Sequence, residues 1–551
     1  MTEPAGSRST LTRVIPIGGV GEFGANATII ETAETTVLVD YGLMFPPNQR
    51  QPGVDFFVND PELLLEQFPR LSALFVTHAH EDHIGGIGFL LEKRNLPIYT
   101  MPYTAKMLAR AFTYFKADPE IVETTRNQPV CHGDLSVEFI GVTHSIAQAC
   151  ALAIRTPDGT IVHTGDFKVD PAPPDDWPFQ SDRLRELGEQ GVDLLIMDST
   201  NAGKQGFCPS ERELVPHLER EIGEAKGRIL FTTFSSHMPR IKNLKRIARR
   251  LGRRIAFLGR GFHRHFSISQ DIGYVDHQPD VFATLEEALA LPDHKVILVL
   301  TGSQAETQSA LMRVAGDGLK GVKIRAGDRI IFSSKAIPGN ERAIALLSAD
   351  LERKGAEVIT EKTHHVHTSG HGFREDLTYM LMLTQPKTVV PIHGEFSHLL
   401  HHFQWLRSLI NPRQQSLLVE NGDILELKNG ETERGPSLPT AMIPIDGTRN
   451  IPLENRVVRE RKDLMYSGLV LIVIRQVKRG HQFEVSTNGM AESFPDEVAA
   501  YLEKILAKLS LPGTTRAEWA DEVYFTIKKT VKKVFGLRPV IRVIVEGHIL
   551  K

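Results

Sequence analysis

The sequence predicts a multidomain α/β protein, and three observations support this fold class. The chain has 551 residues, more than one domain of roughly 100 to 200 residues holds. Residues 14–200 contain short β-branched runs separated by turns, a pattern typical of buried strands. After Thr200 helical and strand-like segments alternate, which indicates βαβ crossovers and a parallel sheet.

The first block is predicted to be rich in strands. We expect a helix at Pro61–Gln67, because Asp60 can cap it and proline suits its first position. The expected strands are Val14–Ile17, Thr28–Ile30, Thr36–Val39, Ala73–Val76, Val137–Ile140, Ala151–Ile154, Thr160–His163 and Leu194–Met197.

The second block, to about Gly370, is predicted to be a separate domain. Its expected helices are Glu211–Ala225, Pro239–Leu251 and Ser267–Gly273, and its expected strands are Arg228–Thr232, Arg254–Leu258, Lys295–Leu300 and Arg329–Phe332. The Gly/Pro/Thr-rich stretch Asn429–Asn450 is predicted to be a linker. A small α/β unit should follow, with strands Leu469–Ile474 and Val540–Val545 and helices Asp496–Leu509 and Ala517–Phe535.

Composition excludes several classes of protein. Hydrophobic residues make up 41% and charged residues 24%, which excludes wholesale disorder. The balance of 64 Lys plus Arg against 67 Asp plus Glu gives no global cationic field. Three cysteines, Cys131, Cys150 and Cys208, are too few for a disulfide framework and indicate a reducing compartment. With no apolar signal at Met1–Leu11 and no apolar run of about 20 residues, we expect a cytoplasmic protein without membrane association.

The densest motif is Thr77–His83, directly after the apolar run Ala73–Val76. Imidazole nitrogen and carboxylate oxygen are ligands that suit Zn²⁺. His78 and His80 can point at one ion while Asp82 and His83 turn towards a second. A solvated polar loop is the alternative, which this density of ligands disfavours.

Three further residues at strand ends complete two sets of ligands. His144 follows the strand near Val137–Ile140, Asp166 follows Thr160–His163, and His393 ends the strand-like Thr388–Ile392. The predicted sets are His78, His80 and His144 for one metal and Asp82, His83 and His393 for the other, with Asp166 bridging them.

These motifs resemble the metallo-β-lactamase superfamily and, within its β-CASP branch, the ribonuclease J family. The supporting stretches are Gly18–Asn26, Asp40–Pro46, Thr164–Asp170, Asp198–Ala202, Ile337–Glu341 and His367–His371. The resemblance implies an α/β metallo-β-lactamase αββα sandwich with an inserted β-CASP α/β domain and a small C-terminal α/β domain. The implied boundaries are 10–206 and 372–440 for the sandwich, 207–371 for the insertion, 441–458 for a linker and 459–551 for the C-terminal domain.

The resemblance also implies an activity. It implies a ribonuclease that holds two Zn²⁺ per subunit, with Mn²⁺ or Mg²⁺ as alternatives, and leaves 5′-phosphate products. Such an enzyme trims RNA from the 5′ end and also cuts internally, in RNA maturation and mRNA decay. The implied partners are single-stranded RNA with a 5′-monophosphate end, further copies of the chain in a dimer or tetramer, and other RNA-decay proteins.

Particular residues match the family's functional positions. Asp82, Asp198 and His371 match catalytic positions, with Asp198 supporting His371 opposite the scissile phosphate. His367, Ser369 and Gly370 match positions that hold an RNA phosphate.

Three alternatives share these features. A β-CASP nuclease acting on DNA has the same ligands, and a non-catalytic RNA-binding component of a decay complex has the same fold. A small-molecule hydrolase shares the first motif, but it needs neither an inserted domain nor the pair His371 and His393. Intact ligands at every position argue against the non-catalytic alternative.

Three other features have less specific interpretations. Gly19–Gly24 satisfies G-x-G-x-x-G, but β-branched Thr28–Ile30 follows it instead of a helix, which argues against dinucleotide binding. Ten basic residues without an acid lie between Arg240 and Arg264, typical of a solvated helix face or of a track for RNA phosphates. The expected helix-surface histidines are His398, His401 and His402.

Overall fold

The computed structural model describes residues 11–46, 51–276, 278–337, 339–409, 411, 414–447, 451–477, 480–490, 495–509, 515–536, 538–545 and 548–549. Pro338, within the motif Ile337–Glu341, lies outside the described residues. The chain divides into two compact units. The first contains residues up to Met44 together with Val58–Met442, and the second contains Phe45–Phe57 and the chain from Ile443 onward. Among the described residues, no helix combines the length and apolarity needed to cross a membrane.

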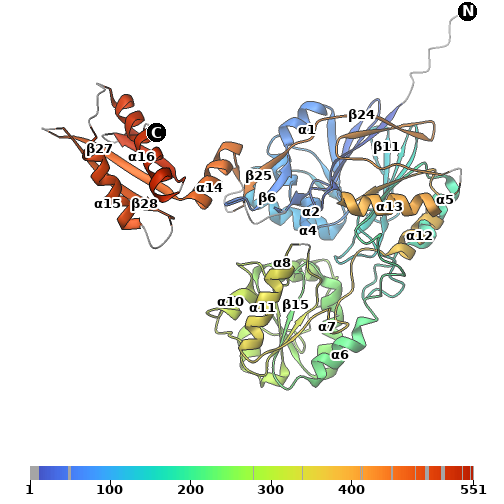
Figure 1. The fold of residues 1–551 in the computed structure, drawn as a ribbon. Helices are drawn as coiled ribbons and strands as arrows, with labels where there is room; N and C mark the ends of the chain where they lie inside the picture. The colour runs from blue at the N-terminus through green and yellow to red at the C-terminus, as the bar shows by residue number, and fades with distance from the viewer. Residues whose placement is uncertain are drawn as a thin grey trace, which may run out of the picture. The chain divides into compact units, whose positions relative to one another are not determined.

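Two sheets make up the sandwich part of the first unit (Figure 1). One has the order β24-β23-β1-β3-β4-β7-β8-β9, and the other has the order β10-β11-β12-β13-β14-β20-β22. The strands of the first sheet are β1 (Thr12–Gly18), β3 (Ala27–Glu31), β4 (Thr36–Val39), β7 (Leu71–Phe75), β8 (Ile98–Thr100), β9 (Ile121–Glu123), β23 (Asp423–Lys428) and β24 (Glu431–Ser437). Those of the second are β10 (Val130–His132), β11 (Leu135–Gly141), β12 (Cys150–Thr156), β13 (Gly159–His163), β14 (Leu194–Asp198), β20 (Thr388–Ile392) and β22 (Gln415–Ser416).

Alternating residues on each strand fill two different cores. Val37 and Val39 of β4 pack with Phe139 of the second sheet, whereas Leu38 joins the cluster that contains the helices. This is the period of two expected when a sheet is buried on both faces. The covering helices are α1 (Pro61–Gln67), α4 (Pro102–Ala111), α5 (Ser181–Gln190), α12 (Arg374–Thr384) and α13 (Phe396–Leu409). The predicted αββα sandwich is therefore confirmed.

The helix expected at Pro61–Gln67 is present with the predicted cap. The side chain of Asp60 accepts hydrogen bonds from the backbone N–H groups of Glu62 and Leu63. Two of the otherwise unpaired donors at the start of α1 are thereby satisfied.

The inserted domain has a five-stranded sheet of order β16-β17-β15-β18-β19, whose strands are parallel as predicted, and β19 adds a strand to the four that were expected. Its strands are β15 (Ile229–Thr232), β16 (Arg254–Leu258), β17 (Val296–Leu300), β18 (Arg329–Phe332) and β19 (Glu357–Ile359). Its main helices are α6 (Leu214–Glu224), α7 (Met238–Leu251), α8 (Arg260–Asp271) and α11 (Glu341–Arg353). Helix α8 begins before the predicted Ser267, because Phe262 and Phe266 supply apolar contacts one turn apart.

The basic run of the inserted domain is not one surface. Arg249 and Arg250 of α7 are exposed, whereas Arg240 and Arg253 are buried. The buried pair bonds to protein groups, Arg240 to Glu211 and Arg253 to backbone oxygens. These two arginines therefore belong neither to a solvated face nor to a phosphate track.

The linker predicted at Asn429–Asn450 is wrong for its first part. β23 and β24 form a hairpin across Asn429 and Gly430, with Lys428 opposite Glu431. Both turn residues have positive φ, 50° and 79°, which Asn-Gly adopts readily in a two-residue hairpin. The range 441–458 likewise contains β25 (Met442–Asp446), β26 (Ile451–Pro452) and the start of α14 (Asn455–Ser467).

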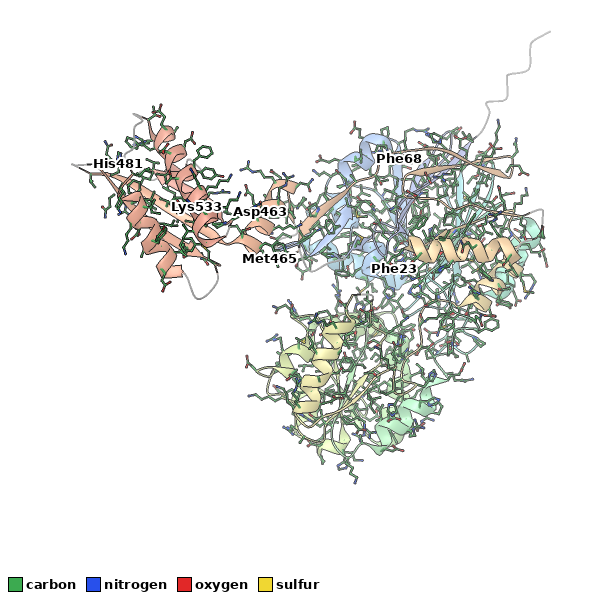
Figure 2. The ribbon with its side chains drawn as sticks, viewed as in Figure 1. Phe23, Phe68, Asp463, Met465, His481 and Lys533 are labelled. Atoms are coloured by element: carbon green, nitrogen blue, oxygen red, sulfur yellow. The ribbon has the colours of Figure 1, made fainter. Side chains whose placement is uncertain are left out.

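The second unit contains a four-stranded sheet of order β28-β27-β29-β30. Its remaining elements are β27 (Leu469–Val477), β28 (Gly480–Asn488), β29 (Val540–Val545), β30 (His548–Ile549), α15 (Pro495–Leu506) and α16 (Arg516–Phe535). Ile472 of β27 and Ile527 of α16 lie in one buried cluster. His481 belongs to β28 (Figure 2). Its ring meets that of Trp519 edge-on, with ring centroids 4.3 Å apart. The small α/β unit predicted from the sequence is thus present.

Candidate metal centre

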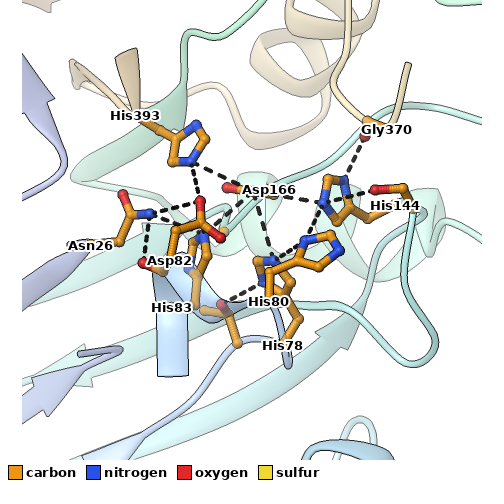
Figure 3. Close-up of polar contacts among 12 residues, drawn as sticks. Asn26, His78, His80, Asp82, His83, His144, Asp166, Gly370 and His393 are labelled. Atoms are coloured by element: carbon orange, nitrogen blue, oxygen red, sulfur yellow. Dashed lines mark hydrogen bonds and ion pairs between the residues drawn. The ribbon is translucent and has the colours of Figure 1, made fainter. Parts of the chain in front are cut away.

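The site forms where the ends of several strands meet. His78 and His80 follow β7, and the short helix α2 (Glu81–Ile84) carries Asp82 and His83. His144, Asp166 and His393 follow β11, β13 and β20. The structure brings together every residue predicted as a ligand (Figure 3): His78, His80, Asp82, His83, His144, Asp166 and His393.

The ligand atoms fall into two groups that share Asp166. One group is His78, His80, His144 and Asp166, and the other is Asp82, His83, Asp166 and His393. Within each group the ligand atoms lie within 4.8 Å of one another. Asp166 Oδ2 lies 3.7 Å from His78 Nε2, 3.3 Å from His83 Nε2 and 3.7 Å from the Nε2 atoms of His144 and His393. One carboxylate oxygen is therefore central to both groups.

In the first group, imidazole nitrogen atoms face one another at hydrogen-bond distance. The carbonyl of Gly370 can only accept, so His144 Nδ1, at 2.7 Å, carries the ring's proton. A lone pair on His144 Nε2 then faces His80 Nδ1 at 3.1 Å, and His78 Nε2 lies equally close to that atom. The other Asp166 oxygen, Oδ1, is buried and has no hydrogen-bond partner among the described residues. This arrangement of donors fits divalent cations.

The pKa shifts differ between the two groups. Burial lowers the pKa of His80 to about 4 and the pKa values of His78 and His144 well below 6.5. These rings are neutral near pH 7 and can bind a cation directly. Burial also acts to lower the pKa values of His83 and His393, but the adjacent Asp166 and other carboxylates outweigh it and raise both. A cation in the second group would therefore displace protons.

The sequence reading missed the residues behind the ligands. Asp40 Oδ2 accepts hydrogen bonds from His83 Nδ1 and Thr77 Oγ1, both at 2.8 Å, and Thr77 Oγ1 lies 3.0 Å from His78 Nδ1. Asn26 donates to the backbone oxygen of Asp82 at 3.0 Å. Asp40 and Asn26 lie in stretches that support the family resemblance, and the available sign in the sequence was an acidic residue directly after the predicted strand Thr36–Val39. Such supporting residues fix the orientation and tautomer of ligand histidines.

A second network orients His371 and His393. Thr200 Oγ1 donates to Asp198 Oδ1 and lies 2.8 Å from both that oxygen and His393 Nδ1. His371 Nδ1 donates to Asp198 Oδ2 at 2.8 Å. Burial acts to lower the pKa of His371, but Asp198 and Asp166 outweigh it, so the pKa is raised. The His371 side chain is 20% exposed and its Nε2 lies 4.0 Å from Asp166 Oδ2, so the ring faces the shared carboxylate.

The three residues predicted to bind phosphate lie on one loop beside this network. Ser369 Oγ accepts hydrogen bonds from Asn201 Nδ2 at 2.9 Å and from the backbone N–H of His371 at 3.1 Å. A Cβ on Gly370 would lie 2.7 Å from Ser145 Oγ and 2.9 Å from the His144 ring, so a larger residue here would displace one of these side chains. The buried Nδ1 of His367 has no partner among the residues that the structure describes.

His402, predicted on a helix surface, is buried. Its Nδ1 lies 2.9 Å from Ser199 Oγ, next to Asp198 in sequence. The prediction was wrong because α13 packs this face against the strand end that carries the site.

Three family models match the chain. "Beta-lactamase superfamily domain" matches residues 35–226, "Ribonuclease J, beta-CASP domain" matches 226–351, and "Zn-dependent metallo-hydrolase RNA specificity domain" matches 355–413.

The chain is also similar to a solved protein of unknown function from Enterococcus faecalis V583. That structure has a TM-score of 0.55 and 19% identity, and the match covers 76% of this chain and 100% of that one. At this identity the likeness concerns the fold alone.

Two curated relatives are similar over nearly their whole length. Ribonuclease J of Thermus thermophilus is 35% identical over 567 residues, covering 97% of this chain and 95% of that protein. Ribonuclease J of Sinorhizobium meliloti is 36% identical over 552 residues, covering 96% of each. Together with the three matching models, this shows that the chain belongs to the ribonuclease J family of the β-lactamase superfamily.

Proposed function

We propose that the chain is a two-metal phosphodiesterase that hydrolyses RNA and leaves 5′-phosphate products. It trims from a 5′-monophosphate end in the 5′-to-3′ direction and also cuts internally. One observation carries the proposal. The two groups of ligands share Asp166 Oδ2, and His371, which is held by Asp198 through Nδ1, directs its Nε2 towards that shared oxygen. This arrangement suits a phosphodiester, whose two non-bridging oxygens can each meet a cation.

The donors support zinc as the metal. Three histidines and a carboxylate would hold the first cation, and two histidines and two carboxylates the second. Zn²⁺ prefers such nitrogen and oxygen donors, and Mn²⁺ or Mg²⁺ are alternatives that a metal analysis would distinguish. When bound, such cations would polarise the phosphate and lower the pKa of a metal-bound water molecule.

The chain's own side chains supply orientation and proton transfer. His371 is held by Asp198 at Nδ1, which leaves Nε2 directed towards the shared carboxylate and able to protonate the departing 3′-oxygen of RNA. Asp82 is 34% exposed and accepts a weak hydrogen bond from Asn26 Nδ2 at 3.5 Å. We assign Asp82 two roles, as a ligand and as an acceptor for the attacking water.

The loop 367–370 supports recognition of a 5′-phosphate. Because Ser369 Oγ already accepts two hydrogen bonds, its own proton can be donated to a phosphate oxygen. His367 and the backbone at Gly370 lie on the same loop. The proposal assigns these residues to the terminal phosphate of single-stranded RNA.

The proposal extends to the cellular setting. It places the enzyme in the cytoplasm, in RNA maturation and mRNA decay, as a dimer or tetramer with other RNA-decay proteins. Light scattering on the purified chain would measure the number of subunits. Fractionation and affinity purification from the source cells would test the location and the partners.

Cleavage of one RNA bearing 5′-monophosphate, 5′-triphosphate or 5′-hydroxyl, beside the equivalent DNA, tests the activity. We expect mononucleotides to be released fastest from the monophosphate RNA, with activity lost in His80→Ala and 5′-end preference lost in Ser369→Ala. If the enzyme releases internal fragments at the same rate whatever group the 5′ end bears, the proposed phosphate pocket is wrong. Preference for DNA would favour a DNA nuclease, and no cleavage of either would favour a non-catalytic RNA-binding protein.

A further inference from the structure

The two groups of ligands are held from different parts of the first unit. In the second group, His83 is held by Asp40 and His393 by Thr200, and both supporting residues follow strands of the sandwich. In the first group, His80 Nε2 lies 3.2 Å from Ser236 Oγ. Ser236 lies in the loop between β15 and α7 of the inserted domain.

The other ligands of the first group show the same division. His144 donates to the carbonyl of Gly370, in the segment that returns from the inserted domain to the sandwich. His78 is supported from within the sandwich, through Thr77. Two of the three histidines in the first group thus make polar contacts with the insertion or its return segment. The hydrogen bonds that hold His83 and His393 come from the sandwich, and the return segment meets His393 through the stacked ring of His371.

The contact with Ser236 involves the nitrogen of His80 that points away from the other ligands. His80 Nδ1 faces His78 Nε2 and His144 Nε2, both at 3.1 Å, so Nδ1 is the ligand atom. A neutral imidazole carries one proton, and an acceptor at Nε2 keeps that proton away from Nδ1. The Ser236 hydroxyl is in position to be this acceptor and also to limit rotation of the ring.

We infer that Ser236 is a positioning residue through which the inserted domain completes the first cation site. The affinity of that site for its cation then depends on contact between the inserted domain and the sandwich, whereas the hydrogen bonds that orient His83 and His393 do not cross this contact. By reciprocity, a cation in the first site stabilises that contact. The inference rests on the metal centre of the proposed function and adds that the two cations are controlled separately.

The full chain offers matched variants for the test. Ser236→Ala removes the hydroxyl, and Ser236→Thr retains one. Ser235→Ala removes a hydroxyl from the same loop, where Ser235 makes no hydrogen bond to a ligand histidine among the described contacts. Thr200→Val removes the group behind His393 and therefore acts on the second site.

The measurement is Zn²⁺ binding to chelator-treated protein, by competition with a chromophoric chelator. We expect two equivalents in the wild type, with Ser236→Ala weakening one of them by roughly ten- to a hundredfold and Thr200→Val weakening the other. Ser236→Thr should restore most of the affinity, and Ser235→Ala should behave as wild type. As a second readout, added Zn²⁺ should raise the melting temperature less in Ser236→Ala than in Ser235→Ala.

Two results would overturn the inference while leaving the metal centre intact. These are two unchanged affinities in Ser236→Ala, or equal weakening of both, which would indicate general loosening. A wild type that binds no Zn²⁺, Mn²⁺ or Mg²⁺ would instead remove the metal centre of the proposed function.

Discussion

The first unit contains two buried clusters of charged and polar side chains, one around Arg240 and one at the metal centre, and they differ in how their polar atoms are satisfied. In the inserted domain, Arg240 is fully buried and donates to both carboxylate oxygens of Glu211, at 2.7 and 2.5 Å. It also donates to Ser333 Oγ at 2.5 Å and to the Thr368 carbonyl at 3.3 Å. In the metal centre, by contrast, imidazole nitrogen atoms approach one another to 3.1 Å and a buried carboxylate oxygen lacks a partner among the described residues.

The difference separates a cluster that stabilises the fold from one that binds a ligand. A buried charge is tolerated when an opposite charge and hydrogen bonds compensate it, and the Arg240 cluster meets this condition with protein groups alone. In the metal centre, the raised pKa values of His83 and His393 supply part of the compensating charge, whereas the lowered pKa values of His78, His80 and His144 leave these rings neutral and able to bind a cation. Substitutions should therefore affect folding in the first cluster and cation binding with activity in the second.

The largest expected effect is that of His80→Ala on activity. Loss of one ligand should lower kcat/KM by roughly 10³-fold, because a cation contributes several kcal/mol to the transition state. The apo protein should keep its melting temperature. RNA cleavage and thermal unfolding of the chelated protein measure the two effects. His294→Ala, at an exposed position, is the control. If metal-free His80→Ala protein unfolded at a lower temperature than metal-free wild type, the ligand cluster would also stabilise the fold, which contradicts the distinction between the two clusters.

Arg240→Met should mainly reduce stability. It leaves Glu211 buried without its charge partner, which costs about 3–5 kcal/mol. Urea unfolding measures the change, and Arg249→Met on the exposed face of the same helix should cost less than about 0.5 kcal/mol. Similar stability of the two variants would show that the Arg240 cluster is not what holds this part of the fold.

Asp198→Asn should affect activity without removing cations. The variant weakens the orientation and protonation of His371, so kcat should fall by about a hundredfold, while the bound metal content stays at the wild-type value. Single-turnover cleavage and elemental analysis measure these quantities. Loss of metal together with activity would instead make Asp198 part of the ligand set, which would sharpen the boundary of the centre.

The smallest expected effect is a pH dependence confined to the Arg240 cluster. Burial acts to raise the pKa of Glu211, but Arg240 and His237 outweigh it and hold that pKa well below 4.5. The unfolded state therefore takes up a proton first as the pH falls. The stability from this carboxylate is complete above its ordinary pKa of 4.5 and is lost as the pH drops towards the folded value.

Unfolding midpoints of the wild type and Glu211→Gln measure this dependence. The difference between them should be constant near neutral pH and shrink below 4.5, the ordinary pKa of a glutamate. Burial lowers the pKa of His237 to about 4, so in the folded protein this histidine takes up a proton only at the acid end of the pH range over which the difference shrinks. The exposed Glu224→Gln is the control, and a constant difference down to acid pH would contradict the assignment.

Sequence patterns predicted much of the fold because they report local physics. Thr36–Val39 is a strand with the predicted bounds, and Pro61–Gln67 is a helix with its predicted cap. The hairpin at Asn429 and Gly430 was also present as a local pattern, but the glycine and proline content around it suggested a linker. That error arose because composition was given more weight than the two-residue turn.

The sequence by itself determined the chemistry of the site: three histidines and an aspartate after one strand, with further ligands at other strand ends. Tertiary structure alone decided which groups stand behind them. Ser236 and His80 are far apart in the sequence, and no local pattern indicates their contact. Arg240 and His402 likewise look like surface residues until packing buries them. A residue's type limits what it can bind, whereas its partners depend on which distant segments the fold brings within hydrogen-bond range.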